Sequence, residues 1–284
     1  VASAQVKSAI LLAGLGAQGV TRVTEPVPSR DHTENLLGHF GLGLNITEND
    51  GGVRVISLEG QQSFEPCAVD IPGDPSSAAF PLVAALLLDG SEIQLSHIGI
   101  NPRRTGLFDT LKEMGADIEY VFPRMEAGEP VANIKVRGQG PLKGITVPES
   151  RVPSMIDEFP ILAMAAACAE GTTHMTGLAE LRVKESDRLQ TVADGLKACG
   201  VELDMGEDSL SIHGTGKAPR GGAQIKTFLD HRIAMSFLIL GAVTEEPILI
   251  DDGTPINTSF PTFLNLMNDL GAHIQKTEPQ DQSA

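Results

Sequence analysis

Cationic side chains stand at, or just before, the start of several segments whose apolar spacing predicts helices. They are Arg30, Lys184, Arg188 and Arg232. The positive end of the helix dipole lies at this terminus and disfavours a cation there, so these residues need another explanation. A bound anion supplies one, because the free N–H groups of a helix start and a guanidinium fork can hold the same phosphate or carboxylate. If such helix starts converge in the fold, they form a site for a multiply charged anion.

Acid–base side chains occur in the same kind of segment, where they could transfer protons. They are Asp157, Glu185 and His231. Each also has a purely structural explanation. Asp157 can be the N-cap of the apolar helix that follows it, and Glu185 can form a surface ion pair with Arg188, three residues further on. His231 can be a structural histidine, and the residues alone leave these alternatives open.

The elements that must position these residues form a repeated pattern. Each repeat has an apolar helix, a short strand, an amphipathic helix that ends at a glycine, and further strands. The four glycines, roughly 70 to 85 residues apart, are Gly41, Gly115, Gly200 and Gly271. Each occupies the place after a helix where positive φ is expected. The repeats predict small α/β units packed around a shared centre.

Apolar spacing sets the expected limits of these elements. The apolar helices are expected at residues 8–13, 78–88, 161–169 and 233–240. A strand is expected after each of the four glycines, the last of them around Ile274. Prolines and acidic residues interrupt the pattern between Glu65 and Pro75, which predicts a domain boundary there. Residues 1–71 would then hold about one unit and residues 72–284 about three, with no sheet crossing between them.

Composition narrows the class of ligand. The 284-residue chain is 41% hydrophobic with a net charge of −16, which argues against binding nucleic acid or an anionic membrane surface. A small anionic substrate needs only a local cationic cluster. The apolar stretches have about half the length of a membrane span, and no targeting segment is visible.

The number and spacing of the cysteines indicate the cellular compartment. Cys67, Cys168 and Cys199 are too few and too scattered for a disulfide framework or a zinc site, so no metal is expected. The latter two fall in apolar runs and are expected to be buried, reduced thiols. A reducing cytoplasm is the expected location.

Six segments together resemble the 5-enolpyruvylshikimate-3-phosphate synthase family. They are Ser3–Ser8, Gly73–Ala78, Asn101–Gly106, Ser154–Glu158, Arg182–Arg188 and Asp230–Met235. The likeness runs in order along essentially the whole chain, and Ser154–Glu158 is similar to the bacterial, glyphosate-insensitive branch. The family's fold has two enolpyruvyl-transferase domains, inside-out α/β barrels of three βαβαββ-like units each, with substrates bound between them. The resemblance implies that this chain is roughly the C-terminal three-fifths of a complete enzyme.

The family's reaction transfers the enolpyruvyl group of phosphoenolpyruvate to the 5-hydroxyl of shikimate 3-phosphate and releases phosphate. It implies no metal or organic cofactor. The hydroxyl must lose a proton and the enolpyruvyl methylene must gain one. Because further substrate-binding cations of the family lie upstream of Val1, we expect the isolated chain to bind weakly and to have little activity. A complementary N-terminal segment is an expected partner.

The resemblance implies a role for each candidate residue. Those implied to be catalytic are Asp157, the base at the 5-hydroxyl, Glu185, the proton donor to the methylene, and Lys184, which bonds the shikimate hydroxyls. Shikimate 3-phosphate would be bound by Ser3, Ala4, Gln5, Arg30, Asp157 and Lys184. Phosphoenolpyruvate would be bound by Gln5, Arg188, Arg232 and His231.

Two other functions fit parts of the sequence. UDP-N-acetylglucosamine enolpyruvyl transferases share the fold and the chemistry, but the run Lys184–Arg188 favours the shikimate enzyme. A non-catalytic truncated fragment is the alternative from another class. Thr258 also departs from the family, because many members carry a lysine there.

Overall fold

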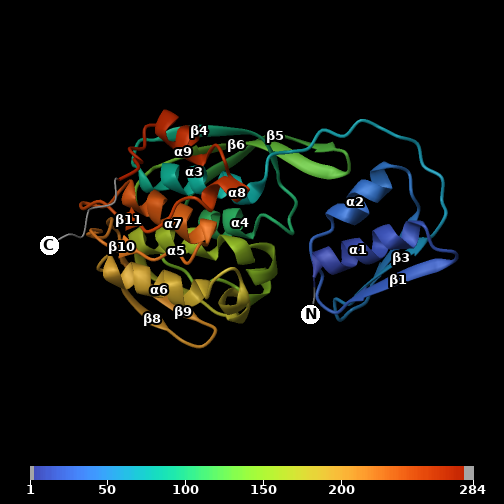
Figure 1. The fold of residues 1–284 in the computed structure, drawn as a ribbon, viewed down its shortest axis with the longest axis horizontal. Helices are drawn as coiled ribbons and strands as arrows, with labels where there is room; N and C mark the ends of the chain where they lie inside the picture. The colour runs from blue at the N-terminus through green and yellow to red at the C-terminus, as the bar shows by residue number, and fades with distance from the viewer. Residues whose placement is uncertain (1–2, 278–284) are drawn as a thin grey trace.

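The computed structural model describes residues 3–277, which form two bodies joined by a linker at residues 60–74 (Figure 1). We call residues 3–59 the N-terminal body. Its elements are α1 (Ala4–Leu15), β1 (Val20–Glu25), α2 (His32–His39), β2 (Leu44–Glu48) and β3 (Arg54–Glu59). The three strands form an antiparallel sheet in the order β1-β3-β2, and the helices pack on it over a small apolar cluster.

We call residues 75–277 the C-terminal body, which holds the other three repeats. The first is α3 (Pro75–Leu87), β4 (Glu92–Gly99), α4 (Gly106–Glu113), β5 (Asp117–Glu126) and β6 (Glu129–Arg137). The second is α5 (Phe159–Cys168), β7 (Glu170–Met175), α6 (Arg188–Ala198), β8 (Glu202–Met205) and β9 (Leu210–Thr215). The third is β10 (Gln224–Ile225), α7 (His231–Gly241), β11 (Leu249–Ile250), α8 (Ile256–Ser259) and α9 (Phe263–Asp269). Short 3₁₀ helices are η1 (Glu149–Ser154), η2 (Ile156–Glu158) and η3 (Ala179–Val183).

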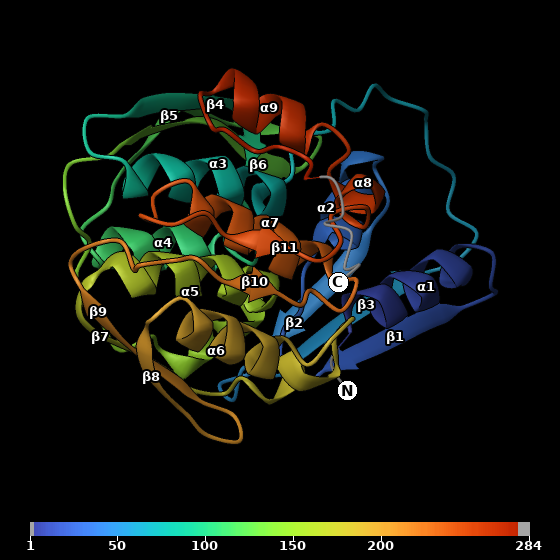
Figure 2. The same cartoon turned by 60° about the vertical axis from the view of Figure 1, so that its left-hand side comes forward.

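The apolar helix of each repeat lies at the centre of the C-terminal body. All ten residues of α5 are buried, as expected for a helix that is apolar on every side. Figure 2 shows α3, α7 and α5 next to one another, between the sheet β4-β6-β5 and the sheet β7-β9-β8. Since these helices meet at the centre, the segments that precede them come near one another as well.

The four repeat glycines have the backbone conformation expected of them. Their φ angles are 82° at Gly41, 96° at Gly115, 88° at Gly200 and 102° at Gly271. A residue with a Cβ is strained in this region, so glycine is what allows each amphipathic helix to end and the chain to turn back.

The prediction of a strand around Ile274 is wrong, because residues 272–277 form no strand. Ile274 instead exchanges hydrogen bonds with the side chain of Asn268, at 2.9 Å in each direction. A strand needs a neighbour to complete its ladder. In the other repeats the following strand provides it, and within residues 3–277 no strand pairs with this segment.

The two bodies have separate sheets and separate apolar clusters. The domain boundary at residue 72 stays a prediction, because independent folding of each body is what would test it. None of the helices in residues 3–277 is long and apolar enough to cross a membrane.

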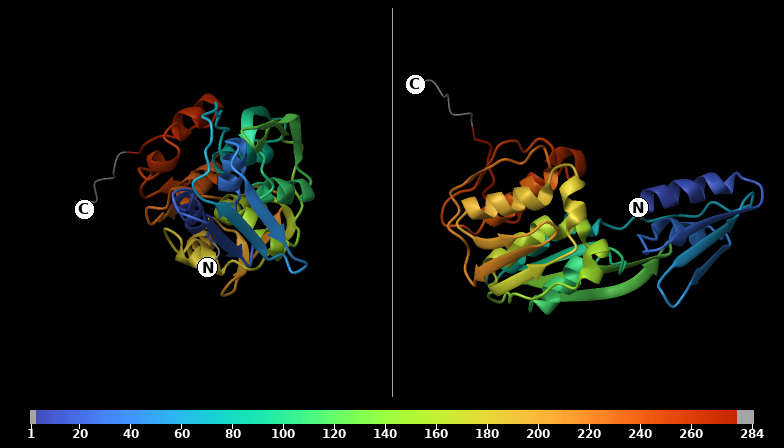
Figure 3. Two further views of the ribbon diagram at one scale, coloured as in Figure 1. Left: turned by 90° about the vertical axis from the view of Figure 1, so that its right-hand side faces the viewer. Right: turned by 90° about the horizontal axis from the view of Figure 1, so that it is seen from below.

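The bodies meet where the hairpin of β5 and β6 reaches α2 (Figure 3). Glu129, at the start of β6, accepts a hydrogen bond from Asn35 at 3.0 Å and pairs with His32 at 2.8 Å. Asp31 pairs with Arg103 of the C-terminal body at 2.9 Å. These polar contacts flank the helix start at which Arg30 lies.

Substitutions of two helical glycines, one packed against a neighbouring helix and one in open space, show how tightly the C-terminal core is packed. In α6, a Cβ on Gly195 would lie 2.3 Å from the ring of Phe237 in α7. Gly195→Ala is therefore expected to lower the free energy of unfolding by about 1–3 kcal/mol through overpacking, despite a helix-propensity gain of about 1 kcal/mol. Gly38→Ala in α2, where a Cβ meets nothing within 4 Å, should raise it by about 0.5–1 kcal/mol. Urea unfolding followed by circular dichroism measures both, and shifts of the same sign would contradict this account.

Candidate active site

Aspartate caps place the arginines at two helix starts. Asp187 accepts a hydrogen bond from the Gln190 N–H at 2.9 Å, and Asp230 accepts one from the Arg232 N–H at 2.9 Å. Aspartate suits this position because it satisfies a free N–H group and complements the helix dipole. The caps fix Arg188 as the first residue of α6 and Arg232 as the second of α7.

Backbone strain marks the approach to α7. Phe228 and Leu229 have φ angles of 51° and 60° and are 62% and 66% exposed. The left-handed conformation is unfavourable for such bulky residues and concentrates at functional sites. Here it turns the chain directly ahead of the Asp230 cap.

Asp157 is the common partner of three cations, Arg30 from the N-terminal body and Lys184 and Arg188 from the segment that leads into α6. Its Oδ2 accepts a hydrogen bond from Arg30 at 2.7 Å. Its Oδ1 lies 3.3 Å from Arg188 NH1 and 3.6 Å from Lys184 Nζ. Asp157 belongs to η2, while α5 has Glu158 at its N-cap position and no side-chain cap, so the N-cap explanation of Asp157 is wrong.

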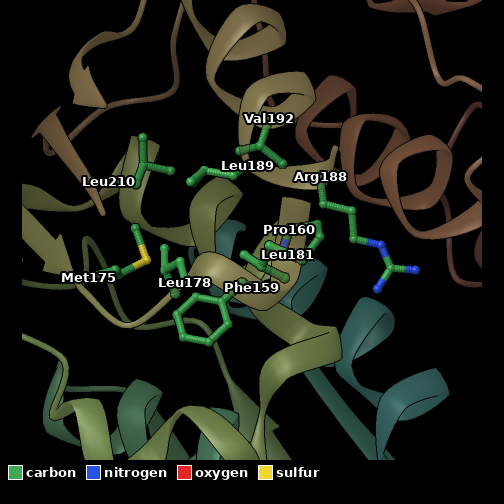
Figure 4. Close-up of a pocket in the computed structure, with 9 residues that line it drawn as sticks. All are labelled: Phe159, Pro160, Met175, Leu178, Leu181, Arg188, Leu189, Val192 and Leu210. Carbon is green, nitrogen blue, oxygen red and sulfur yellow. The ribbon is translucent and has the colours of Figure 1, made fainter. Parts of the chain in front are cut away.

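Arg188 is the most buried of these cations, with 1% of its side chain exposed. Its Nε donates to Asp230 at 2.7 Å and its NH2 donates to Glu185 at 2.6 Å. Figure 4 shows its guanidinium extending away from the apolar side chains that pack beside α6. The Glu185–Arg188 ion pair is therefore present, but on the arginine side it is not a surface pair.

The environment of Asp157 holds it ionised. Burial raises its pKa, but the charge of Arg232, the hydrogen bond and charge of Arg30 and the charge of Lys184 outweigh burial and hold the pKa well below its usual range. The pKa of Asp230 is also lowered, because Arg188 outweighs burial. The cluster is therefore a set of cations compensated by carboxylates.

His231 begins α7 beside this cluster. Burial and the charge of Arg232 lower its pKa, which favours a neutral imidazole. Arg232 reaches toward Asp157, with NH1 3.4 Å from the Asp157 carbonyl oxygen. Lys184 also pairs with Glu180 at 2.6 Å. The helix starts that carry the four cationic side chains thus converge in the fold, around Asp157.

Ser3, Ala4 and Gln5 lie at the start of α1, which faces the C-terminal body (Figure 1). Ser3 Oγ accepts from the Val6 N–H at 3.3 Å and donates to Gln5 Oε1 at 3.2 Å. Within residues 3–277 no hydrogen bond or ion pair joins them to Asp157. The structure therefore brings Arg30, but not these three residues, into direct contact with the cluster.

A cavity of about 580 Å³ opens beside Arg30, between the two bodies. Its lining includes Arg30 and Asp31 of the N-terminal body and Arg103 and Ser154 of the C-terminal body. Its size suits a small metabolite. The apolar pocket drawn in Figure 4 is different, because its volume of about 10 Å³ leaves no room for a substrate.

One group in the described part of the chain has the geometry of metal ligands. Asp70, His97 and Glu126 place one ligand atom each within 4.8 Å of one another. His97 already shares a hydrogen bond with Glu126, and Asp70 is 82% exposed. Asp70 lies in the linker, His97 in β4 and Glu126 in β5, so the group is separate from the Asp157 cluster.

Sequence reasoning assigned no functional role to two buried acids of the cluster, Asp230 and Glu158. Both stand in segments singled out above, beside Arg232 and Asp157. Their burial, 0% and 3% exposed, is the distinguishing feature, and it is a property of the fold. The buried-thiol expectation is confirmed for Cys168 and Cys199, and burial raises the pKa of Cys168 to about 12.

Comparison with known proteins gives a consistent result. Residues 1–267 match the sequence profile of EPSP synthase (3-phosphoshikimate 1-carboxyvinyltransferase). The chain is 59% identical over 274 residues to the 3-phosphoshikimate 1-carboxyvinyltransferase of Rhodospirillum rubrum, covering 96% of this chain and 60% of that protein. It is 56% identical to that of Paramagnetospirillum magneticum, covering 98% and 62%. The chain thus spans about 60% of the length of these curated relatives.

Solved structures agree. EPSP synthase from Acinetobacter baumannii superimposes with a TM-score of 0.91 at 48% identity, covering 98% of this chain and 62% of that one. The enolpyruvyl transferase NikO from Streptomyces tendae superimposes with a TM-score of 0.71 at 22% identity, over 94% and 59%, which is a likeness of fold alone. The enolpyruvyl-transferase type of α/β fold expected from the sequence is confirmed.

Proposed function

The chain belongs to the EPSP synthase family, and from that premise we propose that it supplies part of the active site of an enolpyruvyl transferase. The proposed reaction joins the enolpyruvyl group of phosphoenolpyruvate to the 5-hydroxyl of shikimate 3-phosphate and releases phosphate. One observation carries the proposal: Arg30, Lys184 and Arg188 converge on the single carboxylate of Asp157. Cations around a carboxylate suit phosphorylated substrates and a proton transfer together.

The electrostatics suggest how substrate binding prepares the base. Without substrate, Asp157 is stabilised as an anion by its cationic partners, so it is a weak proton acceptor. An anionic substrate that takes over Arg30 and Lys184 removes that stabilisation. The pKa of Asp157 then rises, and the carboxylate becomes a better base for the hydroxyl proton.

Each remaining residue has a proposed part in the same reaction. Glu185, which is about half exposed, would leave Arg188 to the incoming anion, take up a proton from solvent and donate that proton to the methylene carbon. Arg188, Arg232 and the neutral His231 would line the phosphoenolpyruvate side. The residues proposed for shikimate 3-phosphate are Ser3, Ala4, Gln5, Arg30, Asp157 and Lys184.

Several finer points belong to the same proposal. The family match favours the shikimate enzyme over the UDP-N-acetylglucosamine enolpyruvyl transferases. The run Ser154–Glu158 supports the glyphosate-insensitive branch, and the buried thiols of Cys168 and Cys199 support a reducing compartment such as the cytoplasm. Low activity of this chain by itself, and a complementary N-terminal segment as partner, are part of the proposal too. Separate sheets and apolar clusters support a division of the chain near residue 72.

Binding of phosphoenolpyruvate tests this function. Arg232→Met removes one charge-assisted contact to the anion, which is worth roughly 1.5–3 kcal/mol. At about 1.4 kcal/mol per tenfold, the dissociation constant should rise roughly 10- to 150-fold. Titration followed by the ³¹P chemical shift of phosphoenolpyruvate detects even weak binding, with shikimate 3-phosphate titrated in the same way.

Arg220→Met is the matched control, because Arg220 lies on the same body, is 66% exposed and is 3.9 Å from its nearest carboxylate. It removes the same charge away from the cluster and should leave the affinity unchanged. Equal weakening by both variants would mean that only net charge matters. No binding of either substrate to the unaltered chain would remove the support for the proposed site.

A further inference from the structure

Glu158 is a buried carboxyl group with no part in the reaction proposed above. It is 3% exposed, and although it occupies the N-cap position of α5, its side chain caps no N–H group. Its Oε2 is buried and has no hydrogen-bond partner within residues 3–277. Burying a carboxyl group costs free energy that its contacts must offset, so its surroundings need an explanation.

The other oxygen, Oε1, belongs to a series of polar contacts that runs through the C-terminal body. Asp74, the cap of α3, accepts from Arg104 at 2.7 Å, and Arg104 donates to Ser76 Oγ at 2.9 Å. The Ser76 hydroxyl donates to Glu158 Oε1, which lies 3.5 Å from Arg232 NH1. The chain joins the start of α3 to the start of α7 through the residue that precedes α5. It thus uses two of the segments flagged in the sequence, Gly73–Ala78 and Asn101–Gly106, to which no role had been assigned.

Within residues 3–277, only one nitrogen of the Arg232 guanidinium group, Nη1, has protein partners. Nη1 faces both the Glu158 carboxyl and the Asp157 carbonyl oxygen, the latter at 3.4 Å. In the part of the chain that the structure describes, neither its Nε nor its Nη2 donates a hydrogen bond. The side chain is 17% exposed. A guanidinium anchored at Nη1 keeps its other donors for a ligand, in a fixed plane.

We propose that Glu158 is a positioning residue: held by Ser76, its carboxyl group anchors NH1 of Arg232 and presents the rest of the guanidinium to an anionic ligand. The ligand class is a phosphorylated or carboxylated small molecule. The identity of that ligand as phosphoenolpyruvate rests on the proposed function, whereas the anchoring of Arg232 does not.

The two adjacent acids support this division of roles. Burial raises the pKa of Glu158, against the opposing effects of Arg232 and Ser76. Asp157, one residue earlier, has its pKa lowered by its cations despite burial. A Glu158 carboxyl group that retains its proton still accepts hydrogen bonds through Oε1, and it leaves the charge of Arg232 available to the ligand.

The first test measures the anchoring without any ligand. The ¹⁵N relaxation of the Arg232 Nε–H group, assigned with Arg232→Lys, reports how ordered the guanidinium is. Glu158→Met should increase its mobility, and Glu158→Gln, which keeps a carbonyl acceptor, should preserve its order. Glu113→Met, on an exposed acid paired with Arg151, is the control and should have no effect. An Arg232 signal equally ordered in Glu158→Met and the unaltered chain overturns the proposal.

The second test measures coupling to the ligand, with phosphoenolpyruvate as the probe. Glu158→Met should weaken binding about tenfold, the order of one charge-assisted contact, with affinity largely restored in Glu158→Gln. In an Arg232→Met background, Glu158→Met should have no further effect, because it acts through Arg232. An equal loss in both backgrounds shows a merely structural effect and overturns the proposal. If the unaltered chain binds no phosphoenolpyruvate, the proposed function fails, and the relaxation measurement still decides the anchoring.

Discussion

Replacing Arg188 by methionine is expected to lower the free energy of unfolding of the C-terminal body by about 3–5 kcal/mol. Arg188 is 1% exposed, and its partner Asp230 is completely buried, at 2.7 Å. Removing the cation leaves the Asp230 carboxyl group buried without its counter-ion, so it either stays charged where water cannot solvate it or takes up a proton at a free-energy cost. The cost is that of an unpaired buried charge, which is much larger than the value of a surface ion pair. Urea unfolding of the two proteins measures the difference.

A matched substitution and a double variant separate this effect from loss of packing. Arg182→Met removes an arginine from the same segment. Its ion pair with Asp187 is 28% and 40% exposed, and its hydrogen bonds to the carbonyl oxygens of Gly206 and Glu207 are also at the surface, so the loss should stay below about 1 kcal/mol. Combining Arg188→Met with Asp230→Asn removes the stranded charge and keeps a cap for α7. This double variant should recover a large part of the stability. If it is no more stable than Arg188→Met, the buried-charge explanation is wrong.

Acid unfolding gives a further readout of the same substitution. The pKa of Asp230 is held below its ordinary value, because Arg188 outweighs burial. A lowered pKa in the folded state means that the stabilisation is present above the unfolded value of about 4 and is lost as the pH falls below it. The unaltered chain should therefore lose stability on acidification below about pH 4 more steeply than Arg188→Met does. If the free energy of unfolding of both proteins falls equally with pH, Arg188 does not lower the pKa of Asp230.

The second large effect is expected in the N-terminal body, from Lys7→Met. Lys7 Nζ lies 3.1 Å from Glu25 and 2.9 Å from Glu34, and the exposed fractions of the three side chains are 2%, 5% and 1%. Without the ammonium group Glu34 keeps only Arg54, at 3.5 Å, and Glu25 keeps only its hydrogen bonds from Ser29. Two buried carboxylates then share too little positive charge, at a cost of about 3–5 kcal/mol. The apolar cluster of this body is small and cannot absorb such a loss. Local unfolding of β1–β3 should follow.

Amide hydrogen exchange measures that unfolding for each body separately. In Lys7→Met the amides of β1 and β3 should exchange much faster, whereas those of β7 and β9 should be unchanged. Arg22→Met is the control, since Arg22 lies on the exposed side of β1 and its loss removes the same charge. Unchanged protection of β1 and β3, or equal acceleration in β7 and β9, would refute the prediction.

Much of the fold could be predicted because its signals are local. Gly41, Gly115, Gly200 and Gly271 mark helix ends through a backbone conformation that other residues avoid. The uninterrupted apolar run of α5 predicts a central helix, and it is buried on every side. The cations at the helix starts indicated an anion site, because the helix dipole alone disfavours them. Periodicity, capping and backbone preference act over a few residues, so they can be seen in the sequence alone.

Which side chains form ion pairs, and which strands pair, was decided only by the tertiary structure. Arg30 and Asp157 are 127 positions apart and belong to different bodies, yet they form a 2.7 Å ion pair. Asp157 and Glu158 are adjacent in the sequence, but one is surrounded by cations and the other lies against Ser76 and Arg232, so their pKa values move in opposite directions. The strand expected at Ile274 is missing for the same reason, since a strand exists only with a neighbour. Burial, charge compensation and strand pairing depend on what other parts of the chain bring alongside, and no local pattern contains that information.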